Sequence, residues 1–129
     1  MTNIANLNRE AELINDGLDS IVVVQDLADV PGGRTLDVSE LPADVEVIKA
    51  GYVLVENTTT HVVKPLAVSG NAYQAKPEGY LYFGILKHSI LKKDPRAAIL
   101  RVGQVNAAAC PYPITNAIKE GLPRIDFIY

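Results

Sequence analysis

The sequence predicts a mainly β protein with short helices, folded as a compact small barrel or sandwich-like body with an extended N-terminal arm. The 129-residue chain holds eight prolines and nine glycines, and these turn-formers separate about six to eight short segments rich in β-favouring residues. Patterns typical of long helices are few. A chain of this length fits one domain and can bury a hydrophobic core without disulfides.

Residues 77–91 form the densest block of large apolar residues and predict the central strand of the body. A Pro-Glu-Gly turn precedes them, and aromatic and β-branched residues favour a buried strand. Gly84 interrupts the block, which predicts a bulge or the close approach of another backbone. The other strands are expected to pack around this one.

Further strands are predicted on both sides of the central block, at residues 34–40, 45–55 (in two pieces around Gly51), 61–68, 97–105 and 124–129. Residues 57–60 are polar and predict a hairpin loop. Pro65 cannot donate a ladder hydrogen bond, so its strand is expected at an edge or with a break. A short helix is predicted over 113–121, beginning at Pro113 or capped by Thr115, with Gly121 at its end.

Residues 1–33 are predicted to form the arm, and residues 34–129 the β-rich body. Within 4–18, apolar residues recur at alternating spacings of three and four, as on one face of a helix. A helix this short is marginal alone in water, so we expect it to dock on the body or on a partner. Residues 20–25 predict a short strand, and 26–33 a polar loop with a Gly-rich hinge. A terminal apolar strand either joins its own sheet or adds to another chain's sheet.

Composition argues against several classes of function. The net charge of −3 disfavours duplex nucleic acid as the main partner, because neutralising phosphates requires a basic surface. No apolar run is long enough to span a bilayer, and no signal sequence opens the chain. The single cysteine, Cys110, excludes an intrachain disulfide and is expected to be a small buried residue. We therefore expect a soluble protein made in the cytoplasm.

Candidate catalytic and metal-binding residues are sparse. His61 and His88 lack neighbours at metal-ligand spacing, and the Gly-rich stretch 31–35 lacks the phosphate-loop pattern. Cys110 and either histidine could form a nucleophilic pair only if the fold brings them together, so an enzyme is kept as the less favoured hypothesis. The expectation is a non-enzymatic protein with no metal and no cofactor.

Four segments of the second half resemble tailed-phage head decoration proteins of the lambda-like, capsid-stabilising family. They are Ala50-Gly51-Tyr52-Val53-Leu54, Val63-Lys64-Pro65-Leu66-Ala67, Gly84-Ile85-Leu86 and Gly103-Gln104-Val105-Asn106-Ala107-Ala108. The resemblance implies a structural virion protein, made in the host cytoplasm, that binds the outer surface of a phage capsid and stabilises the major capsid lattice. It also implies a homotrimer and no cofactor.

The resemblance further implies an N-terminal arm that reaches onto the lattice and adds a strand to the major capsid protein. The candidate contact residues are Ile4, Leu7, Ile14, Ile21, Val22, Val23 and Val24. Two alternatives remain: a head-fibre or collar-associated virion protein, and a small non-viral β domain that binds a ligand or acts as an enzyme.

Overall fold

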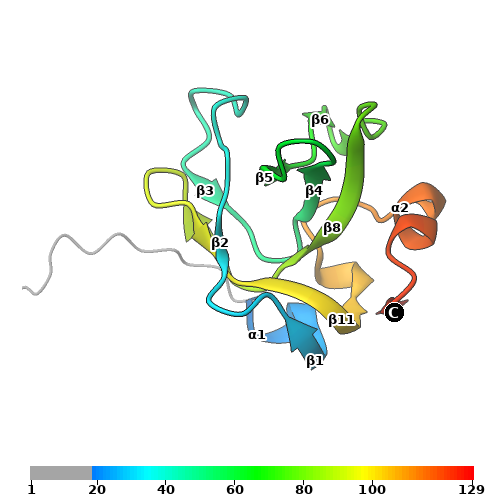
Figure 1. Ribbon diagram of the computed structural model, residues 1–129. Coiled ribbons are helices and arrows are strands. Elements are labelled where there is room, and N and C mark those ends of the chain that lie inside the picture. The colour runs from blue at the N-terminus through cyan, green and yellow to red at the C-terminus, as the bar shows by residue number, and fades with distance from the viewer. Residues whose placement is uncertain (1–18) are drawn as a thin grey trace, which may run out of the picture.

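The computed structural model describes residues 19–129, which form a mainly β fold with short helices, as the sequence predicts (Figure 1). The predicted helical stripe within 4–18 lies outside the described residues. In chain order the elements are α1 (Asp19–Val22), β1 (Val23–Asp29), β2 (Arg34–Thr35), β3 (Val47–Ile48), β4 (Val53–Asn57), β5 (Val63–Pro65), β6 (Val68–Ser69), β7 (Ala72–Tyr73), β8 (Tyr80–Leu86), β9 (Ile90–Leu91), β10 (Arg96–Ala97), β11 (Ile99–Asn106), the 3-10 helix η1 (Ala107–Ala109), α2 (Asn116–Gly121) and β12 (Ile125–Ile128).

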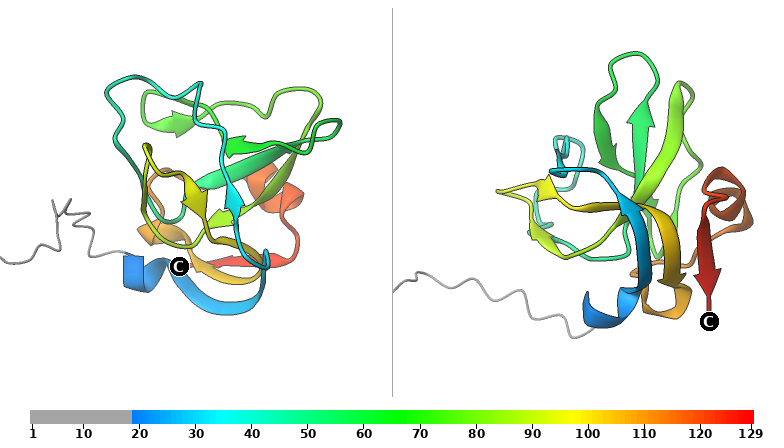
Figure 2. Two further views of the ribbon diagram at one scale, coloured as in Figure 1. Left: turned by 60° about the vertical axis from the view of Figure 1, so that its left-hand side comes forward. Right: turned by 60° about the horizontal axis from the view of Figure 1, so that its bottom comes forward.

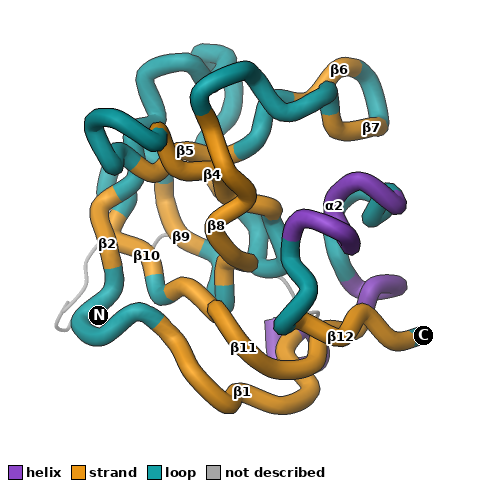
Figure 3. The backbone as a smooth tube through the Cα atoms, turned by 45° about the vertical axis from the view of Figure 1, so that its right-hand side comes forward, coloured by secondary structure: helices purple, strands orange, loops and turns teal. Residues whose placement is uncertain are grey.

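A six-stranded sheet in the order β1-β11-β8-β4-β5, with β12 beside β11, dominates the described residues. β8 lies in the middle of this order, which confirms the predicted central strand. β8 pairs extensively with β4, but with β11 only through Leu86–Ile99 and Ile85–Leu100. The sheet therefore splays beyond this short pairing, and β4 and β8 turn away from β11 and β1 (Figures 1 and 3).

Gly84 combines both features predicted for it. The register between β4 and β8 shifts so that Leu54 faces Gly84 while Val55 faces Tyr82, which leaves Phe83 as the extra residue of a bulge. A Cβ atom at Gly84 would lie 2.4 Å from the carbonyl oxygen of Leu100. Glycine thus permits the close contact between β8 and β11.

The hairpin between β4 and β5 follows the prediction. The side-chain oxygen of Asn57 accepts hydrogen bonds from the backbone N–H groups of Thr59 and Thr60, at 2.8 and 2.9 Å, which shapes the loop. Pro65 ends β5, the outermost strand on this side of the sheet. An edge position tolerates a residue that cannot donate a hydrogen bond, so the edge prediction is confirmed.

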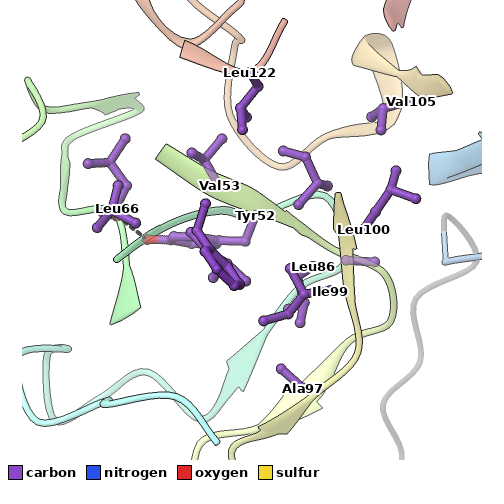
Figure 4. Close-up of a cluster of buried hydrophobic side chains, with 14 of the residues drawn as sticks. Tyr52, Val53, Leu66, Leu86, Ala97, Ile99, Leu100, Val105 and Leu122 are labelled. Atoms are coloured by element: carbon purple, nitrogen blue, oxygen red, sulfur yellow. Dashed lines mark hydrogen bonds between the residues drawn. The ribbon is translucent and has the colours of Figure 1, made fainter. Parts of the chain in front are cut away.

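The core joins side chains of the main sheet with side chains of the segments around it, such as Ala97 on β10 and Leu122 after α2 (Figure 4). Tyr52 and Tyr73 are buried there, and both hydroxyls are hydrogen-bonded. The Tyr52 hydroxyl donates to the Leu66 carbonyl at 3.0 Å, and the Tyr73 hydroxyl accepts from the Val53 N–H at 3.0 Å. Both rings contact Tyr112 in edge-on geometry. These bonds satisfy polar atoms that would otherwise destabilise the apolar interior.

The C-terminal segment is tied into the sheet. Thr115 caps α2, with its side-chain oxygen accepting from the Ile118 N–H at 3.3 Å, so the Thr115 alternative is the correct one. β12 then pairs in parallel with the second half of β11, from Gly103–Ile125 to Asn106–Ile128. It occupies the side of β11 that β8 leaves, which confirms the predicted terminal strand.

The N-terminal part of the described chain differs from the prediction. The strand expected over 20–25 is correct for residues 23–25, which begin a strand that continues to Asp29, whereas residues 20–22 belong to a helical turn, α1. Val22 on α1 is fully buried and contacts the core, so tertiary packing overrides the β preference of valine here. The loop expected from residue 26 is largely strand, and β1 pairs with β11 (Figure 2). Residues 23–29 therefore belong to the sheet of the body and not to a separate arm.

A second difference concerns residues 34–40, where only Arg34–Thr35 form a strand. The Asp37 side chain accepts from the Ser39 N–H and hydroxyl, at 3.0 and 2.7 Å, and this local turn replaces the strand ladder. The burial that the alternating pattern predicts is correct for Leu36, which is buried in the core.

Candidate interaction surface

Three large apolar side chains are exposed within one short segment at the start of the described chain. Ile21 on α1 is 46% exposed, and Val24 and Leu27 on β1 are 46% and 64% exposed. Among residues 19–129, the other exposed large apolar residues lie singly: Val62 before β5, Leu81 on β8 and Tyr129 after β12. Isolated apolar residues at a surface are ordinary, whereas three in one short segment make that segment the candidate for an interaction site. We call Ile21, Val24 and Leu27 the β1 surface.

The pairing of β1 with β11 is irregular at two of these residues. Val23 faces Val105 and Gln25 faces Gln104, so Val24 has no partner of its own on β11. Asp26 and Ala28 likewise face consecutive residues of β11, which leaves Leu27 unmatched. A bulge redirects the side chain of the extra residue. Both exposed large apolar residues of β1 are thus bulge residues.

β1 is also an edge strand. It ends the sheet order, and within residues 19–129 only β11 pairs with it. An edge strand presents backbone N–H and C=O groups that another strand can use, whereas bulges limit such pairing. Side-chain contacts through Val24 and Leu27 therefore suit this surface better than a long added strand.

The predicted contact residues divide into four groups. Ile21 and Val24 are exposed, as an interaction site requires, and Val23 is half-buried against the core. Val22 is fully buried and cannot contact a partner in this fold, so its assignment is wrong. Ile4, Leu7 and Ile14 lie outside the described residues. Leu27 was not predicted, because Gln25, Asp26 and Asp29 around it suggest a polar loop.

A lysine from the other half of the fold holds β1 in place. The Lys87 ammonium group, just after β8, contacts the carboxylates of Asp26 and Asp29, the latter at 2.8 Å. The hydrogen bond from Lys87 lowers the pKa of Asp29, and the hydrogen bonds with Asp26 and Asp29 raise the pKa of Lys87. The attraction between the oppositely charged Lys87 and Asp29, together with the contact to Asp26, ties β1 to the body.

The residues of the enzyme alternative do not come together. His61 is exposed in the β4–β5 loop with its Nδ1 3.5 Å from Glu56, and His88 is exposed after β8. Cys110 follows η1 and packs against the core, where burial raises the pKa of its thiol to about 11. Among residues 19–129, no three His, Cys, Asp or Glu side chains are grouped as metal ligands would be.

The described residues border hollows away from β1. One, of about 340 Å³, is bordered by the Gly32–Gly33 turn and by Arg34 and Arg96. Another, of about 520 Å³, lies between Gly32 and the segment from Ile90 to Arg96. A further one, of about 550 Å³, lies between the 40–49 segment and the rings of Tyr52 and Tyr112. None of these brings together a nucleophile, a base and an oxyanion donor, which a catalytic site for acyl transfer would require.

Comparisons of the chain with protein-family models, with curated proteins and with solved structures gave no match. Within the described part of the chain, no helix has the length and apolar character needed to cross a membrane.

Proposed function

We propose that this chain is a structural virion protein that binds the outside of a phage capsid and stabilises the lattice of the major capsid protein. The observation that carries this proposal is the β1 surface, where Ile21, Val24 and Leu27 are exposed on a short edge segment. A role in binding requires such a surface and no catalytic group.

The placement of the family-like segments supports the proposal. The four segments that resemble decoration proteins lie on or beside β4, β5, β8 and β11, which are consecutive strands of one sheet. Gly51 in the first segment approaches Cys110, just beyond the last one, because a Cβ atom there would lie 3.1 Å from the Cys110 Cα atom. The resemblance thus falls on a continuous structural unit and not on scattered loops.

The proposal divides the chain into two roles. The sheet and its core form a scaffold, and the β1 surface, together with residues 1–18 that precede it, contacts the capsid. Burial of the exposed Ile21, Val24 and Leu27 side chains against a partner would contribute roughly 25 cal/mol of binding free energy per Å² of apolar surface. Repetition over a symmetric lattice, by a homotrimer as the resemblance implies, multiplies such modest contacts.

The direct test mixes the purified protein with expanded, empty shells of a phage major capsid protein, followed by electron microscopy. We expect ordered density at every equivalent lattice position. Density confined to one vertex or to the neck would instead indicate the head-fibre or collar role. Shells without added density would refute capsid binding.

A truncation refines this test. Removal of residues 2–18 leaves every described element, including the buried anchor Val22, whereas a cut at residue 25 would remove part of the sheet. We expect the shorter chain to keep the thermal unfolding transition of the body and to bind shells more weakly. Equal binding by the two chains would remove residues 1–18 from the proposed contact.

A further inference from the structure

We propose that β1 is a strap held closed by Lys87, and that it opens locally while the rest of the sheet stays folded. The proposal concerns the free protein and does not depend on capsid binding. It assigns to Lys87 the role of a latch, because both carboxylates that this lysine contacts lie on β1.

β1 buries little of its own surface. Val23 is half-buried, and every residue from Val24 to Asp29 is exposed. Segments with few buried apolar contacts open at lower free energy than the core strands around them. By contrast, β4 contributes the fully buried Val53, Leu54 and Val55, so its opening requires loss of the core.

Anchors bound the strap at both ends. Before it, Val22 is fully buried in the core. After it, the Val30 N–H donates to the Ile99 carbonyl at 3.0 Å. Residues 23–29 can therefore separate from β11 while these two attachments remain.

The pairing of β1 with β11 is irregular. Three register shifts interrupt it within seven residues, so the ladder is less continuous than that of a regular pair. At Gly103 a Cβ atom would lie 2.1 Å from the Gln25 carbonyl oxygen, which shows how closely the two backbones lie when the strap is closed. Closure thus depends on backbone contact and on the latch, since side-chain burial contributes little.

Lys87 is well placed to act as the latch. Its own N–H donates to the Ala98 carbonyl at 2.9 Å, which fixes its backbone to the body. Its side chain is only 16% exposed, so its two ion pairs are less screened by water than those of a free surface lysine. Breaking the latch should therefore change the opening of β1 more than the stability of the core.

Amide hydrogen exchange of the full-length protein, read by mass spectrometry, tests the proposal. In the wild type we expect residues 23–29 to exchange faster than residues 80–86. Lys87→Met, which keeps much of the aliphatic stem, should speed exchange over 23–29 by about threefold to tenfold. Exchange over 53–57 and 80–86 should stay as in the wild type. In about 1 M salt, where screening acts within roughly 3 Å, the wild type should approach the variant.

Two further variants make the result specific. Asp26→Asn with Asp29→Asn removes the partners of Lys87, and its effect should match that of Lys87→Met without adding to it. Arg96→Met is the control, because it breaks the exposed Arg96–Asp94 pair, whose Nε–Oδ1 distance is 2.9 Å, away from β1. It should leave residues 23–29 unchanged.

Four results would contradict the strap proposal. The first is that residues 23–29 and 80–86 of the wild type exchange at equal rates. The second and third are that Lys87→Met does not speed exchange over 23–29, or speeds exchange over 80–86 by as much. The fourth is that the effects of the lysine and aspartate substitutions on exchange add together.

Discussion

Gly84 and Leu100 lie so close that a Cβ atom on the glycine would be 2.4 Å from the leucine carbonyl oxygen. The contact falls where β8 and β11 pair for only two residues before they diverge. The same glycine stands beside the bulge that shifts the register between β8 and β4. One residue without a side chain thus lets the central strand contact β11 closely while it changes register against β4.

Substitution Gly84→Ala tests this relationship. The added methyl group meets backbone, which cannot rotate away, so we expect the free energy of unfolding to fall by about 3 kcal/mol. Gly79→Ala is the control: its φ is +82° but open space surrounds it. That control should lose only about 1 kcal/mol, from backbone conformation alone. Urea unfolding followed by circular dichroism measures both, and equal losses would contradict the close contact.

A second glycine, Gly121, allows α2 to pack closely against the sheet. A Cβ atom there would lie 2.1 Å from Cδ2 of Tyr82 on β8. We expect Gly121→Ala to cost about 2 kcal/mol of stability, and to cost clearly less when Tyr82→Leu removes the ring. Additive losses in the double variant would show that the ring does not set the distance between α2 and β8.

Acid should destabilise the fold through three carboxylates. Hydrogen bonds from Lys87, Ser39 and Arg96 lower the pKa values of Asp29, Asp37 and Asp94, respectively, below 3.8. A lowered pKa in the folded state stabilises the fold above the unfolded value, and this contribution is lost as the pH falls through the folded pKa.

The melting temperature should therefore drop as the pH is lowered from about 6 to about 3. Ser39→Ala, which removes a donor to Asp37, should make the drop smaller. A melting temperature that is flat or rises over this range would contradict the assignment of these hydrogen bonds.

Cys110 should react slowly in the folded protein. Burial raises its pKa from 9.0 to about 11, and two pH units correspond to about a hundredfold less thiolate at neutral pH. Alkylation by iodoacetamide should be at least about a hundredfold slower than for cysteine free in solution. Unfolding in urea should restore the alkylation rate of cysteine free in solution. A fast reaction in the folded state would revive the nucleophile alternative.

The sequence predicts the parts of this fold where burial imposes a pattern. β8 is recognisable because its second half, residues 83–86, is buried in the core, and Pro65 and Thr115 act through local backbone chemistry that needs no tertiary information. Gly84 is visible as an interruption, although its contact with Leu100 is not.

β1 is harder to predict for the opposite physical reason. Neither of its faces is buried, so its polar residues Gln25, Asp26 and Asp29 show no alternation and resemble a loop. Leu27 is the unmatched residue at a register shift against β11, which a local pattern does not show. The Lys87 latch joins residues about sixty positions apart, which a local pattern does not reveal. Val22 was misassigned because an isolated valine run does not show which member is buried.

The binding role of β1 is tested most directly by the affinity of Leu27→Asp for capsid shells. Leu27 is 64% exposed, so this variant should unfold at the wild-type urea concentration. Its binding to expanded shells should fall at least about tenfold, because a charge replaces an apolar contact. Leu81→Asp is the matched control, since Leu81 is 57% exposed on β8 and should bind as the wild type does. Wild-type binding by Leu27→Asp, or an equal loss in both variants, would contradict a binding role for β1.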